Sequence, residues 1–249
     1  MKQWKTLNKN KPIVIYWASS GSFERNDWML YRDPENLQDE LIKMKEPRSE
    51  RESFFNCPAV VSRIKNIFVF KNATEIEFLY DFTDSNNEKI ITTKGIQAQY
   101  LKPSSIKGGS YAGLPLQWVF FAEEEVEILI NSPSHHPISE LQEKAILPFG
   151  KIDPSKYFRP FSYEIQIRDL AGKITIKENE PLFYLEILTD RPVILKRFVY
   201  TEKIRSYANH AGSIRHVFGK MMPLIEKYKA FKESRMTEIV LKEIKENLI

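Results

Sequence analysis

The sequence predicts a mainly β protein with C-terminal helices, an α+β fold built on an antiparallel β-sandwich or jelly-roll-like core. Apolar and polar residues alternate along residues 76–82 and 161–168, as in strands that bury one face. After Thr201 the apolar spacing changes to three and four residues, the period of a helix. A chain of 249 residues with 42% hydrophobic residues can bury a core without disulfides or metal ions.

The first 53 residues form one predicted segment. Residues 13–18 are β-branched, aromatic or small, which favours a strand. Asp33 can cap a helix and Pro34 can open its first turn, so we expect a helix over residues 34–45. The charged residues of 46–52 have the composition of a solvated linker.

Residues 54–200 make up the predicted antiparallel sandwich. Turn residues at 169–172, 178–181 and 190–192 separate four short apolar runs, which predicts a four-stranded meander. Its strands are expected at residues 161–168, 173–177, 182–188 and 193–200. Further strands are expected at residues 67–70, 76–82, 89–93, 96–101, 116–122 and 126–131.

Residues 201–249 are predicted to be helical. Thr201 can cap a first helix, Pro223 can begin a second, and a third carries an apolar stripe from Met236 to Leu248. Such stripes need a surface to cover them. That surface is either the outer face of the sandwich or another subunit.

Charge is unevenly distributed although the net charge is only +4. Residues 191–249 hold 13 basic and 6 acidic residues, whereas the rest of the chain holds 24 and 27. This asymmetry can mark a nucleic-acid or membrane surface, and solvated helix faces are the plainer interpretation. The longest apolar runs, at residues 13–18 and 118–122, are far shorter than the ~20 residues of a transmembrane helix.

Familiar catalytic motifs are absent from the sequence. Neither a phosphate-binding glycine loop, nor GxGxxG, nor GxSxG occurs. The single cysteine, Cys57, lies among apolar residues, which predicts a buried, unreactive thiol. The four histidines do not follow the HxH or HxD…H patterns of cupins and iron-dependent dioxygenases. A metal pocket could be assembled only from distant residues, with His136, His210 and Glu124 as candidates.

A basic and aromatic cluster precedes the strand expected at 161–168. Its members are Lys156, Tyr157, Phe158 and Arg159. Aromatic rings among cations can stack on a base or sugar, or anchor a partner protein. Alternatively, the rings enter the core while the cations extend into solvent.

A second candidate binding residue is Trp118, which lies just before the acidic run at residues 123–127. Aromatic neighbours could tune one of these carboxylates for acid–base chemistry. A charged hairpin turn between two strands explains the same residues more simply.

Several short stretches resemble other proteins. Residues 55–58, 65–69, 150–151, 156–160 and 180–184 are similar to segments of uncharacterised proteins encoded by large tailed bacteriophages, especially marine ones. The resemblance extends from about residue 54 to the C-terminus. It implies no activity, cofactor or partner, and it implies a location in the host cytoplasm or the virion.

Three functional hypotheses follow. The first is a non-enzymatic interaction or structural protein with a protein partner or a homo-oligomeric state. The second is a cupin-like protein with a small-molecule or metal pocket, either a dioxygenase-type enzyme or a ligand-sequestering protein. The third is nucleic-acid binding through the basic C-terminal region. The sequence favours a protein that is not an enzyme, and it leaves any cofactor unknown.

Overall fold

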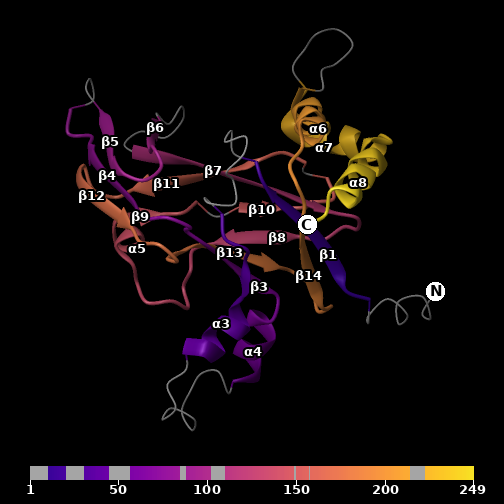
Figure 1. Cartoon of the computed structure of the whole chain (residues 1–249), viewed down its shortest axis with the longest axis horizontal. Coiled ribbons are helices and arrows are strands. Elements are labelled where there is room, and N and C mark those ends of the chain that lie inside the picture. The colour runs from indigo at the N-terminus through magenta and orange to yellow at the C-terminus, as the bar shows by residue number, and fades with distance from the viewer. Residues whose placement is uncertain are drawn as a thin grey trace.

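The computed structural model describes residues 11–20, 31–44, 57–84, 88–101, 110–148, 150–156, 158–213 and 222–249. Three sheets, mostly antiparallel, occupy the middle of the molecule, and helices follow at the C-terminus (Figure 1). The predicted α+β fold class is therefore confirmed. None of the helices in these ranges is long and apolar enough to cross a membrane.

The largest sheet has six strands in the order β14-β1-β7-β11-β9, with β6 also pairing with β7. Their bounds are Ile13–Ser19 for β1, Gln99–Leu101 for β6, Ser110–Ala122 for β7, Ala145–Ile146 for β9, Phe161–Ile167 for β11 and Val193–Arg197 for β14. Strand β1 runs parallel to β14 and antiparallel to β7, where Trp17 lies opposite Phe120. The two longest apolar runs of the sequence are thus neighbours within this sheet.

A five-stranded sheet has the order β10-β8-β13-β3-β2, and a three-stranded sheet has the order β12-β4-β5. The five-stranded sheet contains β2 (Glu35–Asn36), β3 (Ile67–Lys71), β8 (Ile128–Asn131), β10 (Gly150–Ile152) and β13 (Pro181–Ile187). The three-stranded sheet contains β4 (Ile76–Asp81), β5 (Lys89–Lys94) and β12 (Ala171–Ile176). All three sheets contribute side chains to one hydrophobic core.

Aromatic rings fill the space between the two larger sheets. Phe70 of β3 stacks on Phe183 of β13 with ring centroids 4.7 Å apart, and its ring meets that of Trp118 on β7 edge to face at 6.1 Å. Trp118 also meets Phe183 at 4.9 Å. Edge-to-face and stacked pairs at these distances add to the stability gained from burial alone.

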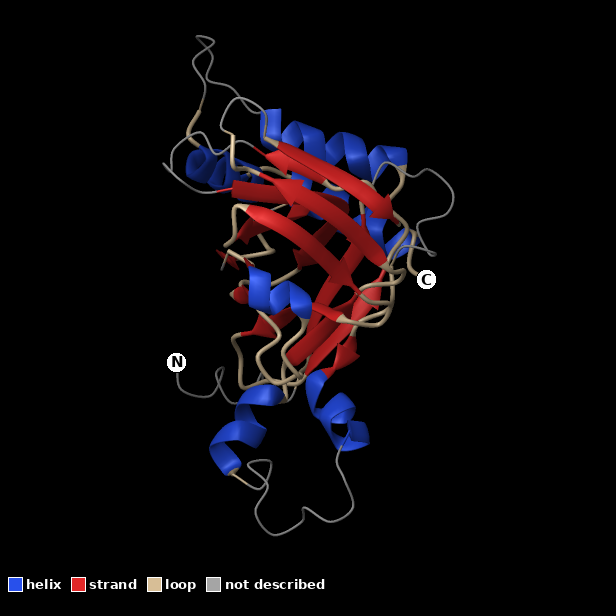
Figure 2. Cartoon of the chain, turned by 90° about the vertical axis from the view of Figure 1, so that its left-hand side faces the viewer, coloured by secondary structure: helices blue, strands red, loops and turns tan. Residues whose placement is uncertain are grey.

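Helices cover the outer faces of this sandwich (Figure 2). Helices α3 (Leu37–Met44) and α4 (Pro58–Ile64) pack on the five-stranded sheet around Tyr184. Helices α6 (Glu202–Ser213), α7 (Leu224–Glu233) and α8 (Met236–Glu246) pack on the six-stranded sheet. The short helix α5 (Glu140–Lys144) lies against β12.

Strand β1 is apolar or aromatic from Ile13 to Ala18 and ends at Ser19. Ile15 and Trp17 face the interior of the sandwich, whereas Tyr16 and Ala18 face the C-terminal helices. Both faces of the strand are buried, so polar residues have no favourable position along it. The C-terminal helices therefore dock on their own sandwich, which was one of the two alternatives left open by the sequence.

The predicted meander is wrong. Strand β11 pairs with β7 and β9, β12 with β4, β13 with β3 and β8, and β14 with β1. Turn residues mark where the chain changes direction, but they carry no information about which strand becomes the neighbour. The hairpin expected at residues 123–127 is wrong for the same reason, because β7 and β8 belong to different sheets.

Two local predictions also need correction. The helix expected over residues 34–45 begins at Leu37, because Glu35–Asn36 pairs with β3 and the Asn36 side chain accepts a hydrogen bond from the Gln38 N–H (2.9 Å). Cys57 is exposed rather than buried, since it precedes the unpredicted helix α4. The charged linker of 46–52 lies outside the described residues.

Other local signals are confirmed. The Thr201 hydroxyl accepts a hydrogen bond from the Ile204 N–H at 3.2 Å, and Pro223 immediately precedes α7. The turn between β12 and β13 contains Asn179 with a φ of 63°, in the left-handed region that asparagine tolerates.

Candidate functional site

The three candidate metal ligands do not come together. His136 lies in the loop before α5, His210 lies on α6, and Glu124 forms a bidentate ion pair with Arg191 at 2.6 and 2.9 Å. Across the residues that the structure describes, no group of three His, Cys, Asp or Glu side chains could hold a metal ion.

The aromatic candidates belong to the core. Phe158 is 1% exposed, and its ring meets that of Phe121 at 5.6 Å and that of Phe231 at 5.9 Å. Trp118 is 2% exposed inside the sandwich. Neither ring can stack on a ligand at the surface, because both are enclosed by neighbouring layers. Tyr157 lies outside the described residues.

Lys156 and Arg159 are the basic residues of the cluster at residues 156–159, and both point to the surface. Lys156 pairs with Asp153 at 2.8 Å and with Glu125 at 3.3 Å, and Arg159 is exposed. This matches the alternative in which rings enter the core and cations extend outward.

Two glutamates of the acidic run at residues 123–127 pair with lysines of the C-terminal helices. Glu123 accepts a hydrogen bond from the Tyr16 hydroxyl and pairs with Lys245, both at 2.8 Å. Glu125 pairs with Lys232 of α7. Burial alone would raise the pKa of Glu123, but the contacts with Lys245 and Tyr16 outweigh it and lower that pKa. Some of the basic residues in the C-terminal region therefore form ion pairs within the molecule.

A buried polar network lies between α3 and the five-stranded sheet. His136 Nε2 lies 3.0 Å from Glu40 Oε1, and His136 Nδ1 lies 2.5 Å from the Tyr184 hydroxyl. That hydroxyl also accepts a hydrogen bond from the His135 N–H at 3.1 Å. Because a carboxylate only accepts, Nε2–H donates to Glu40, and in the neutral imidazole Nδ1 accepts from Tyr184.

Glu40 is the central charge of this network. It also pairs with Lys71 at 2.7 Å, while its buried Oε2 has no hydrogen-bond partner among the residues that the structure describes. Burial raises the pKa of Glu40, but the hydrogen bonds from His136 and Lys71 more than offset this and lower it. Because Glu40, His136 and Tyr184 are all buried, the network is suited to joining α3 and the 133–137 loop to the sheet.

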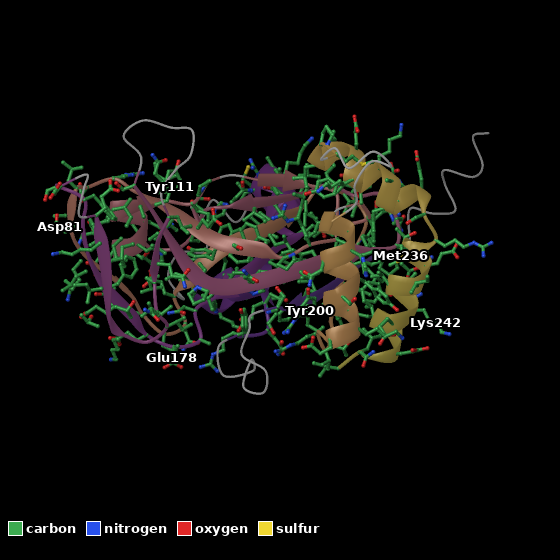
Figure 3. The ribbon with its side chains drawn as sticks, turned by 90° about the horizontal axis from the view of Figure 1, so that it is seen from above. Asp81, Tyr111, Glu178, Tyr200, Met236 and Lys242 are labelled. Atoms are coloured by element: carbon green, nitrogen blue, oxygen red, sulfur yellow. The ribbon has the colours of Figure 1, made fainter. Side chains whose placement is uncertain are left out.

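A groove in the C-terminal helical layer is the best candidate for a binding site. It has a volume of about 660 Å³. The lining residues come from all three helices and the link between α7 and α8: Ser206, Tyr207, His210, Ala211, Ala230, Phe231, Ser234 and Met236. Ala211 of α6 and Ala230 of α7 leave space because their side chains are a single methyl group. Figure 3 labels Met236 at this end of the molecule, opposite Asp81 and Glu178.

A second, polar hollow of about 330 Å³ adjoins the groove along α6. It is lined by Glu202, Arg205, Ser206, Asn209 and His210, so Ser206 and His210 belong to both. Arg205 Nη1 pairs with Glu202 at 2.8 Å. We call the groove and the hollow together the α6 furrow. It has an apolar half and a polar half.

Comparison with protein-family models, curated proteins and solved structures finds no match for this chain. The α6 furrow is therefore interpreted from its own geometry. Among its residues, only His210 was a candidate site residue in the sequence, and it was considered there as a metal ligand. Tyr207, Phe231 and Met236 follow the same helical spacing as ordinary core residues, so no sequence signal separates them from the core.

Proposed function

We propose that this protein is a non-enzymatic binding protein that holds a small amphipathic molecule in the α6 furrow. The apolar groove carries the proposal. Its volume of about 660 Å³ falls within the roughly 300–1,000 Å³ typical of small-molecule pockets, which are mostly apolar with a few polar groups. The pocket protein expected from the sequence is cupin-like. We keep its ligand-sequestering role and place the site in the helical layer instead.

The scaffold supports a preformed groove. Phe231, at 2% exposure, is anchored in the core shared with the six-stranded sheet, and Lys232 pairs with Glu125 beside it. A groove whose walls are already ordered loses little conformational entropy when a ligand binds. By contrast, a cupin-like pocket would need space between the two larger sheets, where aromatic rings contact one another.

The protein-interaction hypothesis stays a prediction beside this proposal. Ile225 is 78% exposed and Leu224 is 44% exposed at the start of α7, and Ile239 of α8 is 43% exposed. Scattered exposed apolar residues are common on monomeric proteins. The groove is therefore the more specific observation.

Filling the groove tests the proposal. Ala230→Trp places an indole in the space that Ala230 leaves on α7, so we expect it to weaken binding of the apolar dye Nile red by about tenfold or more, a loss of ~1.4 kcal/mol. The measurement is a fluorescence titration of the wild-type and variant proteins, with thermal unfolding of both as a check on folding.

A matched control is Ala59→Trp. Ala59 is an exposed residue of α4, on the opposite side of the sandwich from the groove, so the same substitution should leave dye affinity unchanged. If a folded Ala230→Trp protein bound Nile red as tightly as Ala59→Trp does, the dye would occupy another surface and the proposal would be wrong.

A further inference from the structure

We propose that the ligand is an anionic amphiphile, a single molecule whose apolar part lies in the groove and whose acidic head group meets Arg205 and His210. This inference rests on the proposed function and names the chemistry of its ligand. It follows from the two halves of the α6 furrow, which meet at Ser206 and His210.

Helical spacing brings the polar groups together along the α6 side of the groove. Ser206 and His210 are four residues apart and lie on one face of α6, with Arg205 beside them. The hollow therefore offers a hydroxyl, an imidazole and a guanidinium next to apolar walls. Within the described parts of the chain, the His210 ring has no hydrogen-bond partner, so its nitrogens are available to a ligand.

Arg205 supplies the fixed positive charge. Its side chain is 32% exposed and contacts Glu202, whose side chain is 76% exposed. A guanidinium has five N–H donors, so one contact with Glu202 leaves donors for a carboxylate, sulfate or phosphate. Glu202 lies two helical turns from His210 and one turn from Ser206, so the hollow also holds one acidic side chain, which is paired with Arg205.

The size of the groove favours a free molecule over a membrane surface. A concave site of about 660 Å³ has room for one small ligand, whereas a bilayer is contacted through a protruding or flat apolar face. The two halves of the furrow share Ser206 and His210. Adjacent parts of one furrow would therefore recognise the head group and the apolar part of one molecule.

Isothermal titration calorimetry with two probes tests the inference. Dodecanoate and dodecanol, both below their aggregation concentrations, share an apolar chain and differ in head-group charge. We expect wild-type protein to bind dodecanoate about tenfold more tightly than dodecanol. This difference in affinity is about what one charge-assisted hydrogen bond contributes. The double variant Arg205→Gln with His210→Gln should lose this preference and keep its affinity for dodecanol.

Lys242→Gln is the charge-matched control. Lys242, labelled in Figure 3, lies on α8 with a side chain 79% exposed. It lines neither half of the furrow. Removing this positive charge should leave the preference for dodecanoate unchanged. If Lys242→Gln removed the preference as completely as the double variant, long-range charge would explain it and the head-group contact would be ruled out.

The remaining outcomes separate the two proposals. Equal affinities of wild-type protein for dodecanoate and dodecanol would overturn the anionic ligand while leaving the groove as a binding site. Failure to bind either probe would overturn the proposed function itself. Binding to phosphatidylglycerol vesicles without binding of dissolved dodecanoate would show a membrane surface in place of a free ligand.

Discussion

At the residue scale, the buried polar side chains show best which contacts the sequence could and could not predict. His136 could be picked out from the sequence because histidines are few, but its partners Glu40 and Tyr184 lie 96 and 48 residues away along the chain. Contacts over such separations depend on the packing of α3 against β13. One local signal does exist for Glu40, which lies between Leu37 and Leu41 on the buried face of its helix.

Glu40 gives a prediction about pH and stability. Its folded-state pKa is lowered from the ordinary value of 4.5, so its stabilising effect is fully present above that value. The effect is lost as the pH falls through the lower folded-state pKa. We expect Glu40→Gln to reduce the free energy of unfolding by about 1–3 kcal/mol at pH 7. The difference from wild type should shrink below about pH 4.5.

Urea unfolding between pH 7 and pH 3 measures this difference. Glu233→Gln removes an exposed carboxylate from α7 and should change the unfolding free energy by less than about 0.5 kcal/mol. A gap between wild type and Glu40→Gln that stayed constant across this pH range would show that the charge of Glu40 contributes nothing to stability.

At the scale of elements, periodicity identified most strands and the C-terminal helices but not their pairing. The alternation around Phe78 and Tyr163 shows that one face of each strand is buried, and Thr201 marks a helix start that the structure confirms. Pairing was out of reach because consecutive strands β11 to β14 are distributed over three sheets. A strand with one buried face has the same alternation of apolar and polar residues in whichever of these sheets it lies.

The attachment of α8 gives a prediction at this scale. Ile244 is fully buried between α8 and the sandwich, so Ile244→Ala should cost about 2–5 kcal/mol of unfolding free energy. Ile239→Ala makes the same change on the exposed side of α8 and should cost less than about 1 kcal/mol. Denaturant unfolding measures both. Equal losses would mean that burial against the sandwich is not what holds α8.

At the scale of the whole molecule, the sandwich is a filled scaffold and the candidate site lies in the helical layer that covers it. The fold class was predictable because it depends on local periodicity. The α6 furrow was not, since it exists only where Ala211 and Ala230, from different helices, are brought together. The resemblance to phage proteins stays a prediction. The acidic run at residues 123–127 pairs with Lys232 and Lys245, which weakens the case for nucleic-acid binding through the basic C-terminal region.

Native mass spectrometry of the untagged protein with dodecanoate tests most directly whether the α6 furrow holds one ligand, because one spectrum reports both ligand count and subunit number. We expect one bound dodecanoate per wild-type chain and a strongly reduced bound fraction for Ala230→Trp, with Ala59→Trp behaving as wild type. Equal binding to wild type and Ala230→Trp, or several dodecanoate molecules bound to each chain without preference, would contradict a single binding site in the α6 furrow.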